Sequence, residues 1–439
     1  MKKLTAFQII LLASFGAFAV AGVLIFAIAT NSSKGSAVGA VVIWGTLDGS
    51  TFSTQLQAMA QGNTDLSQVS YIHKDPATYE ADITKALASG SGPDLFLMTQ
   101  DEVMSEAGEV GIIPFTSFSQ SQFQTLFIEA AMPYIAPVSL TRAGVIAVPL
   151  LADPLVLYWN KDMFASAGVA QPPQYWDQLD TLTSTLTTKS DGGDIQKSAI
   201  DFGEYQNTDH AKDILIALSM QAGGSITAYE RGGRLISNIV PRTSTVAIEP
   251  PMLTALRFYT GFADPSSSLY TWNRSRPRGQ QAFADGDLAM YVGRASEVRT
   301  IQAKNPNLNF AVAPLPQIRK GIKAVDIARV YALAIARTSH NSGGALTVAY
   351  DLANKVNSGA LASVFSMASP RRDTISDAAQ GNQDIFNKAA IMSYSWVDPN
   401  PTATDRLFQS MIEDTTSGAL LVTEAVSRAD SQMTQIIGN

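Results

Sequence analysis

Residues 144–158, GVIAVPLLADPLVLY, decide the fold of this chain. Their apolar and β-branched composition predicts a strand, a break at Asp153-Pro154, and a second strand through residues 156–158. Proline has no backbone N–H and interrupts a strand ladder. The break therefore indicates that the chain passes here from one folded body to another.

Upstream of this stretch, segments with strand and helix patterns alternate. Such alternation is typical of an α/β layer with a mainly parallel sheet. The predicted strands are residues 41–47, 69–73 and 94–98, and the predicted helices are residues 52–61, 79–88 and 102–108.

Downstream, the pattern is helical from residue 161 to 221, most clearly at 211–222, and a glycine pair at Arg231-Gly232-Gly233-Arg234 predicts a tight hairpin. Further helices are expected at 252–262, 345–356 and 419–437, and strands at the end of 283–293, at 310–315 and at 330–336. We therefore expect an α/β fold of two lobes joined by several crossings. The first lobe comprises residues 41–149 plus about 312–368, and the second comprises residues 150–311 plus about 369–439.

Composition excludes several function classes. The chain has 439 residues, no cysteine and a formal net charge of −7. Its length is ample for large cores. The missing cysteines exclude disulfides, thiolate metal sites and a cysteine nucleophile. The negative charge argues against nucleic acid as a partner.

The N-terminal sequence indicates export. Residues 9–29 are apolar and uncharged, follow Lys2 and Lys3, and are long enough to cross a bilayer as a helix. We expect residues 1–30 to form an uncleaved transmembrane anchor with the body on the extracytoplasmic face, and residues 31–40 to form a tether. A cleaved signal peptide, which would leave a secreted protein, is the alternative.

No motif in the sequence points to catalysis. The three histidines, His73, His210 and His340, lie far apart and none has metal-ligand spacing. The chain lacks G-x-S-x-G, G-K-[ST] and H-E-x-x-H, so the common nucleophile, phosphate-loop and zinc-protease motifs are absent. Paired carboxylates for glycoside hydrolysis could come from Asp153, Glu204 and Glu297, but any acidic protein offers such candidates. We expect no enzyme activity, cofactor or metal.

Three of the five tryptophans stand beside polar or turn residues. Trp44, Trp272 and Trp396 occur in WGTLDG, YTWNR and SWVDPNP, whereas Trp159 and Trp176 fit core positions. An aromatic face at the end of an element can stack on the apolar face of a sugar ring while neighbouring polar groups bind its hydroxyls. Each of the three could instead cover a hydrophobic core.

Several segments, taken in order, resemble the extracellular solute-binding proteins of ABC importers, in particular the sugar- and oligosaccharide-binding, maltose-binding-protein-like group. The resemblance covers nearly everything after residue 40, and its most specific part is residues 144–179, with Y-x-N-K and P-P-x-x-W-x-x-L. The other matching segments are VVIWG (41–45), GSGPDLF (90–96), GIIPF (111–115), FYTGFADP (258–265), AFADGDLAMYVG (282–293) and VAPLPQ (312–317).

This resemblance implies a two-lobe periplasmic-binding-protein-like fold that closes on a carbohydrate by a hinge. It also implies a monomer that delivers its ligand to an ABC permease without chemistry on it. A carbohydrate hydrolase and a membrane-anchored ligand sensor remain as alternatives. The residues that the resemblance assigns to the ligand are Trp44, Asp153, Tyr205, Asn207, Trp272, Gly293, Arg294 and Trp396.

Two features depart from the family pattern. A lipidated cysteine often tethers such proteins, and its absence makes the N-terminal helix the natural substitute. Arg274, Arg276 and Arg278 cluster beside Trp272. The cluster is either a solvated loop or a contact for an anionic ligand such as an acidic sugar.

Overall fold

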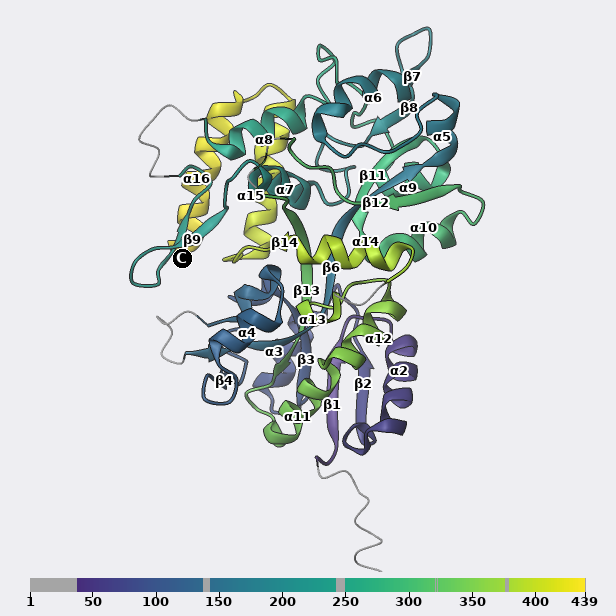
Figure 1. Ribbon diagram of the computed structural model, residues 1–439. Helices are drawn as coiled ribbons and strands as arrows, with labels where there is room; N and C mark the ends of the chain where they lie inside the picture. Colours follow the sequence, from purple (N-terminus) through teal and green to yellow (C-terminus); the bar gives the residue numbers. More distant parts are fainter. Residues whose placement is uncertain are drawn as a thin grey trace, which may run out of the picture.

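The computed structural model describes residues 38–136, 143–241, 249–319, 321, 323–375 and 379–438. These residues form two α/β bodies, one above the other in Figure 1. The predicted anchor at residues 1–30 lies outside the described residues, as does most of the predicted tether. Within the described part, no helix is long and apolar enough to cross a membrane.

The lower body is built on parallel strands. β1 (Val41–Gly45) lies between β2 (Val69–His73) and β3 (Leu95–Thr99) and pairs in parallel with both. β2 and α3 (Tyr79–Ala88) have the predicted bounds. The helices packed around this sheet are α2 (Gly49–Gly62), α4 (Gln120–Leu126), α11 (Ser342–Leu352), α12 (Lys355–Phe365) and α13 (Arg372–Ile375).

The helix predicted at residues 102–108 is wrong. The chain forms the short 3-10 turn η2 (Gln100–Glu102) and then irregular turns. Glu102 caps this turn, because its carboxylate accepts hydrogen bonds from the backbone N–H of Thr99, at 2.6 Å, and from the Thr99 hydroxyl, at 3.2 Å. The segment from residue 102 to 108 is short and has no long apolar face, so packing of its side chains cannot offset the free-energy cost of nucleating a helix.

The two bodies share the long antiparallel strands β6 (Ala147–Asn160) and β13 (Asp326–Ile335). β6 runs without a break through Pro154, which contradicts the interruption that the sequence predicts. The reason is that its partner changes there: residues 147–154 pair with β13, and from Leu155 onward β6 pairs with β11 (Leu288–Arg294). The missing proline N–H thus falls where one ladder ends and the next begins.

The upper body continues the same sheet. β11 is antiparallel to β6 and parallel to β8 (Ile195–Ile200), and β12 (Phe310–Ala313) pairs with the end of β6. The predicted hairpin at the glycine pair is confirmed as β9 (Thr227–Tyr229) and β10 (Leu235–Ser237). The helices are α5 (Lys161–Ser166), α6 (Leu179–Leu186), α7 (Ala211–Gln221), α8 (Pro251–Thr260), α9 (Gly279–Asp285), α10 (Val298–Lys304), α14 (Asn382–Ile391), α15 (Pro401–Thr416) and α16 (Val422–Gly438).

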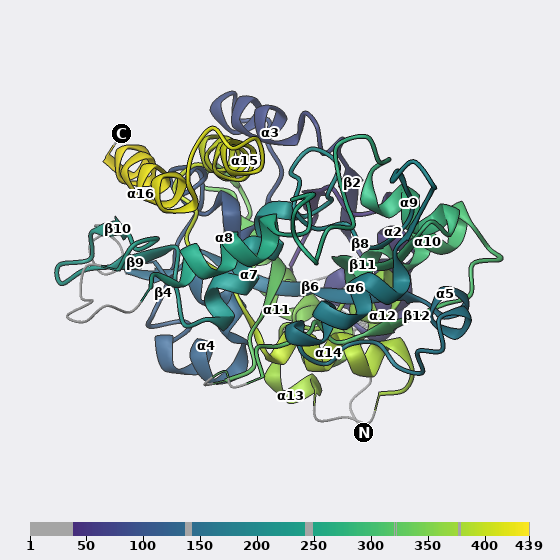
Figure 2. The same ribbon diagram turned by 90° about the horizontal axis from the view of Figure 1, so that it is seen from above.

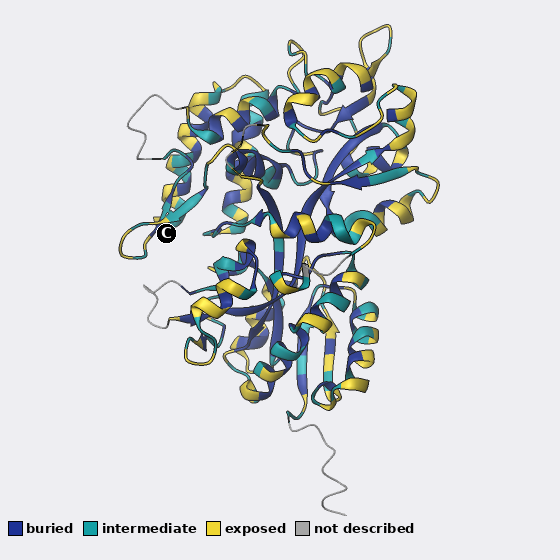
Figure 3. Cartoon of the chain, viewed as in Figure 1, coloured by how far each residue is buried: buried dark blue, intermediate teal, exposed yellow. Residues whose placement is uncertain are grey.

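The main sheet therefore spans both bodies in the order β2-β1-β3-β13-β6-β11-β8-β7, with β12 added to β6 and β14 added to β13. Its central strands are buried and the helices expose their outer faces (Figure 3). From above, α15 and α16 lie on one side of the upper body and α5, α9 and α10 on the other (Figure 2). The remaining strands are β4 (Ile113–Pro114), β5 (Gly144–Val145), β7 (Thr188–Lys189) and β14 (Ser393–Tyr394).

Candidate functional site

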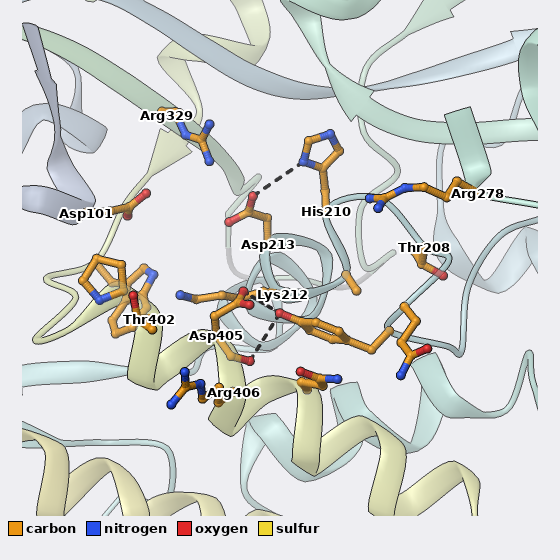
Figure 4. A pocket seen from close by; sticks show the side chains of 16 residues that line it. Asp101, Thr208, His210, Lys212, Asp213, Arg278, Arg329, Thr402, Asp405 and Arg406 are labelled. Carbon is orange, nitrogen blue, oxygen red and sulfur yellow. Dashed lines mark hydrogen bonds and ion pairs between the residues drawn. The ribbon is translucent and has the colours of Figure 1, made fainter. Parts of the chain in front are cut away.

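A cavity of about 800 Å³ lies beside the crossing strands, and we call it the inter-body cavity. η2 of the lower body and the crossing strand β13 contribute one wall, and the loop before α7, α7 itself and α15 contribute the others (Figure 4). Its lining residues are Asp101, Tyr205, Gln206, Thr208, His210, Ala211, Lys212, Asp213, Arg278, Arg329, Trp396, Pro401, Thr402, Asp405, Arg406 and Gln409.

The wall from the lower body and β13 presents Asp101 and Arg329 (Figure 4). Gln100 ties the two elements together, because its side-chain oxygen accepts a hydrogen bond of 2.7 Å from the backbone N–H of Val330. Burial raises the pKa of Asp101, against the lowering effect of Arg329. Arg329 keeps a raised pKa despite burial, because Tyr331, Asp101 and Asp213 surround it. This wall therefore offers a carboxylate and a guanidinium to the cavity.

The opposite wall combines an aromatic ring with polar groups. The Trp396 ring borders the inter-body cavity, and the ammonium of Lys212 lies 5.4 Å from its centroid. Lys212 is paired with Asp398 at 2.9 Å. The Tyr205 hydroxyl donates a hydrogen bond of 2.5 Å to Asp405. An apolar face surrounded by donors and acceptors suits a ligand that has both apolar and hydroxylated surfaces.

A buried ion pair links the inter-body cavity to the crossing strands. Arg294, at the end of β11, has 4% of its side chain exposed and pairs with Asp213 at 2.5 Å. Its other nitrogen donates to the backbone oxygen of Asp153 at 3.0 Å. Burial opposes ionisation of Asp213, but the charges of Arg294 and Arg329 outweigh it and lower the Asp213 pKa.

The structure brings two of the sequence-predicted ligand residues, Tyr205 and Trp396, to the inter-body cavity. Arg294 supports its wall from behind through Asp213. Asp153 is also behind the wall, with 1% exposed, where its carboxylate accepts hydrogen bonds from the backbone N–H and the hydroxyl of Ser296 at 3.0 and 2.7 Å.

The other four predicted residues do not line the inter-body cavity. The Asn207 amide donates to the backbone oxygens of Asn273 and Arg276, at 2.9 and 3.0 Å, and so holds a neighbouring loop. Gly293 packs under Tyr291, where an added Cβ would collide with the ring.

The two remaining aromatic candidates, Trp44 and Trp272, have protein partners in this conformation. The ammonium of Lys74 lies 3.6 Å from the centroid of the half-buried Trp44 ring. Trp272 is completely buried, with the guanidinium of Arg276 5.8 Å from its ring centroid, so no surface of this ring is free for a ligand here.

Each arginine of the cluster at residues 274–278 has a partner within the protein. Arg274 pairs with Glu204 at 2.8 Å, and Arg278 pairs with Asp209 at 2.5 Å. Arg276 donates to the backbone oxygen of Ile195 at 3.0 Å. Only Arg278 of the three borders the inter-body cavity.

Sequence reasoning missed most of the charged lining: Asp101, Lys212, Asp213, Arg329, Asp405 and Arg406. A signal existed for Asp101, because it lies just beyond the carboxyl end of β3, after Gln100, and ligands bind at the carboxyl ends of strands in α/β sheets. Arg329 is a charged residue in a mainly apolar part of β13, which is a second signal that the sequence contains. Among the described residues, no group of three His, Asp or Glu side chains could hold a metal ion.

Comparison with known proteins shows to which family a chain of this architecture belongs. The family model of bacterial extracellular solute-binding proteins matches residues 55–392. A binding protein of Brucella abortus (strain 2308) is 22% identical over 234 residues, 53% of this chain and 52% of that protein. The chain thus matches about half the length of this relative.

Solved structures agree with the fold over almost the whole chain. A solute-binding protein from Thermotoga lettingae, bound to α-D-tagatose, matches with a TM-score of 0.67 at 19% identity and covers 91% of this chain and 100% of that one. A cyclic α-maltosyl-1,6-maltose-binding protein from Arthrobacter globiformis matches with a TM-score of 0.72 at 15% identity, over 91% and 98%. Both confirm the predicted two-lobe α/β fold. From the family match it follows that the chain belongs to the bacterial extracellular solute-binding proteins.

Proposed function

We propose that this protein binds a carbohydrate, either a sugar or an oligosaccharide, in the inter-body cavity and delivers it to an ABC permease without altering it. The single observation that carries the proposal is the position of the cavity, with Asp101 of the lower body and Tyr205, Trp396 and Asp405 of the upper body on opposite walls. A ligand held by both walls favours a closed arrangement, which is how hinge-bending proteins respond to binding.

The chemistry of the walls supports a hydroxyl-rich ligand. Carboxylates accept hydrogen bonds from hydroxyls, the guanidinium of Arg329 donates them, and Trp396 can stack on the apolar face of a sugar ring. Sugars are bound by several proteins of similar fold, including those crystallised with α-D-tagatose and maltotetraose. The volume of about 800 Å³ suits a ligand of oligosaccharide size.

The proposed lobes follow from the strands shared between the bodies. The first contains residues 41–149 and about 312–368, and the second contains residues 150–311 and about 369–439. α13, which follows the proposed first-lobe segment, packs on α4 and α12 and also on α14. The hinge then comprises β6 near Pro154 and the neighbouring part of β13, where the two bodies are connected.

Residues 1–30 are proposed to anchor the protein to the outer face of the membrane, with residues 31–40 as a tether and the protein acting as a monomer. The uncharged length of residues 9–29 supports an anchor. Separation of membrane and medium fractions tests it: an anchored protein stays with the membranes at its full mass, and a cleaved one is released at lower mass.

A thermal-shift screen of the full chain tests the binding activity. The probes are α-D-tagatose, mannotriose and maltotetraose, with glucuronate and glycine as an acidic sugar and a non-sugar. A ligand at 100 times its Kd should raise the unfolding free energy by about 2.7 kcal/mol. Chromatography of the mixture must return the probe unchanged, because product formation would mean an enzyme.

The variants Trp396→Ala and Trp44→Ala make a matched pair, since one ring borders the inter-body cavity and the other does not. We expect only the first to weaken sugar binding. Equal affinity in both variants and the native protein would place the ligand elsewhere. Loss of uptake of the same sugar in cells that lack this protein tests delivery to a permease.

A further inference from the structure

Glu106 of the lower body is a buried acid that lacks a cation partner. The residue is 6% exposed, and its Oε2 atom is buried without a hydrogen-bond partner among the described residues. Tyr79 on α3 lies close enough for the charge of Glu106 to act on it, but its hydroxyl donates to the backbone oxygen of Leu97, at 2.7 Å. A buried carboxylate without a cation or a full set of hydrogen bonds is less stable than the neutral acid.

The charges around Glu106 favour the neutral form as well. Burial, followed by like charges, raises the pKa of Glu106 from 4.5 to about 7. The like charges come from Glu102 in η2, from Glu80 on α3 and from Glu109 in the same loop. Arg337 pairs with Glu109, at 3.9 Å, rather than with Glu106. Geometry and charge therefore agree that Glu106 keeps its proton until the pH is close to neutral.

The loop that carries this acid is tied to β13 at both ends. At the start of residues 100–111, Gln100 accepts the hydrogen bond from the backbone N–H of Val330. At the end, the backbone N–H of Gly111 donates to the backbone oxygen of Ile335 at 2.8 Å. Between these ties the chain forms η2 and irregular turns. Such a segment opens at a lower free-energy cost than the strands on which it packs.

The backbone of Glu106 connects the turns of this loop. Its N–H donates to the backbone oxygen of Glu102 at 2.9 Å, and its own backbone oxygen accepts from the N–H of Glu109 at 2.9 Å. Asp101, which lines the inter-body cavity, directly precedes Glu102 (Figure 4). An ionised Glu106 side chain gains solvation by moving outward, and this movement disturbs the turn that begins next to Asp101.

We propose that Glu106 is a positioning residue that responds to pH: its neutral form keeps residues 100–109 packed and Asp101 in the cavity wall, and its ionisation loosens this segment and weakens ligand binding. The effect on the ligand rests on the proposed carbohydrate binding, whereas the loosening does not. The folded protein holds the Glu106 proton to a higher pH than the unfolded chain does. Its stability therefore falls as the pH rises from 4.5 to about 7.

The test compares Glu106→Gln with Glu424→Gln in the full chain. Glutamine keeps the shape of the neutral acid but does not ionise, and Glu424 is an exposed residue of α16 that does not line the inter-body cavity. Urea unfolding at about pH 5 and about pH 8 gives the folding equilibrium constant of each protein. Relative to the native protein, the constant of Glu106→Gln should increase about 10²-fold between these pH values, and that of Glu424→Gln should change less than about threefold.

Two further readouts follow the loop and the ligand. Amide hydrogen exchange of residues 102–109, corrected for the intrinsic effect of pH, should become faster in the native protein above about pH 7 but not in Glu106→Gln. The maltotetraose affinity of the native protein should fall at least about threefold from about pH 6 to about pH 8.5, and that of Glu106→Gln should stay constant.

Carboxyl 13C NMR of the glutamate-labelled native protein needs no variant, and one glutamate should titrate near pH 7. The inference is overturned if no glutamate titrates above about pH 6, or if the stability difference between Glu106→Gln and the native protein does not change with pH. A native affinity that is constant with pH, or a pH dependence that Glu106→Gln retains, also overturns it. If no sugar binds the native protein, the proposed function fails, and the urea, exchange and NMR data alone decide the role of Glu106.

Discussion

Arg294→Met tests whether the buried ion pair behind the inter-body cavity holds α7 against β11 and the crossing strand β6. Methionine replaces the aliphatic part of arginine but cannot pair with Asp213 or donate to the backbone oxygen of Asp153, to which Arg294 lies at 2.5 and 3.0 Å. The substitution therefore leaves a largely buried carboxylate without its main partner. We expect a clear loss of stability with little change in shape.

The expected size follows from the surroundings of the pair. Removing one partner of a buried ion pair costs about 3–5 kcal/mol, because the other charge stays buried. Arg294 has 4% of its side chain exposed and Asp213 has 23%, so solvent does little to compensate. His210, Lys212 and Arg329 still act on Asp213, which places the expected cost at the lower end, about 3 kcal/mol.

Urea unfolding at pH 7 measures this cost as a change in midpoint at constant slope. The matched control is Arg428→Met, whose pair with Asp414 at 3.1 Å is exposed and should contribute less than about 1 kcal/mol. In the double variant with Asp213→Asn the losses should be less than additive by at least about 1 kcal/mol, since the two side chains interact directly. A loss in Arg294→Met no larger than in the control, or additive losses in the double variant, would refute the reasoning.

Three further predictions concern single side chains. Trp396→Ala should weaken binding of the sugar found in the screen by about 1–3 kcal/mol, measured by titration calorimetry, and unchanged affinity would remove this ring from the site. Trp272→Ala should lower the unfolding free energy by about 3–5 kcal/mol, because the ring is completely buried, and a loss below about 1 kcal/mol in urea would contradict that packing. Burial opposes ionisation of Glu297, but His210 lowers the pKa of this carboxyl group from 4.5 to about 2. The ionised Glu297 therefore adds about 3 kcal/mol to the unfolding free energy above pH 4.5, and this stabilisation is lost as the pH falls toward 2. In Glu297→Gln, acid titration of stability should lack this loss, and an unchanged acid profile would argue against the ion pair.

Periodicity predicted the elements of the fold where local sequence and final environment agree. α3 has its predicted bounds, because its apolar residues at helical spacing, Tyr79, Ile83 and Leu87 among them, are also those that meet the core. β2 has its predicted bounds as well, although Tyr71 is the one buried residue of this strand. β6 shows where local reasoning fails. Pro154 breaks a ladder with one partner strand, but the long-range exchange of β13 for β11 at that residue makes the missing donor harmless. The local sequence around a residue does not reveal which strand will pair with it when that strand lies more than 100 residues away in the sequence.

The candidate site was harder to predict than the fold for a related reason. Aromatic residues at loop ends carry the same local pattern whether they border a cavity, as Trp396 does, or close a core, as the buried Trp272 does. The charged residues that line or support the cavity follow no periodic pattern in the sequence. Their role depends on partners that are distant in the sequence: Arg294 pairs with Asp213, 81 positions away. The same crossing that makes this pairing possible also puts the inter-body cavity beside the proposed hinge. A ligand that contacts Asp213 would therefore act through one side chain, Arg294, on the backbone of β6 where the strand passes between the bodies.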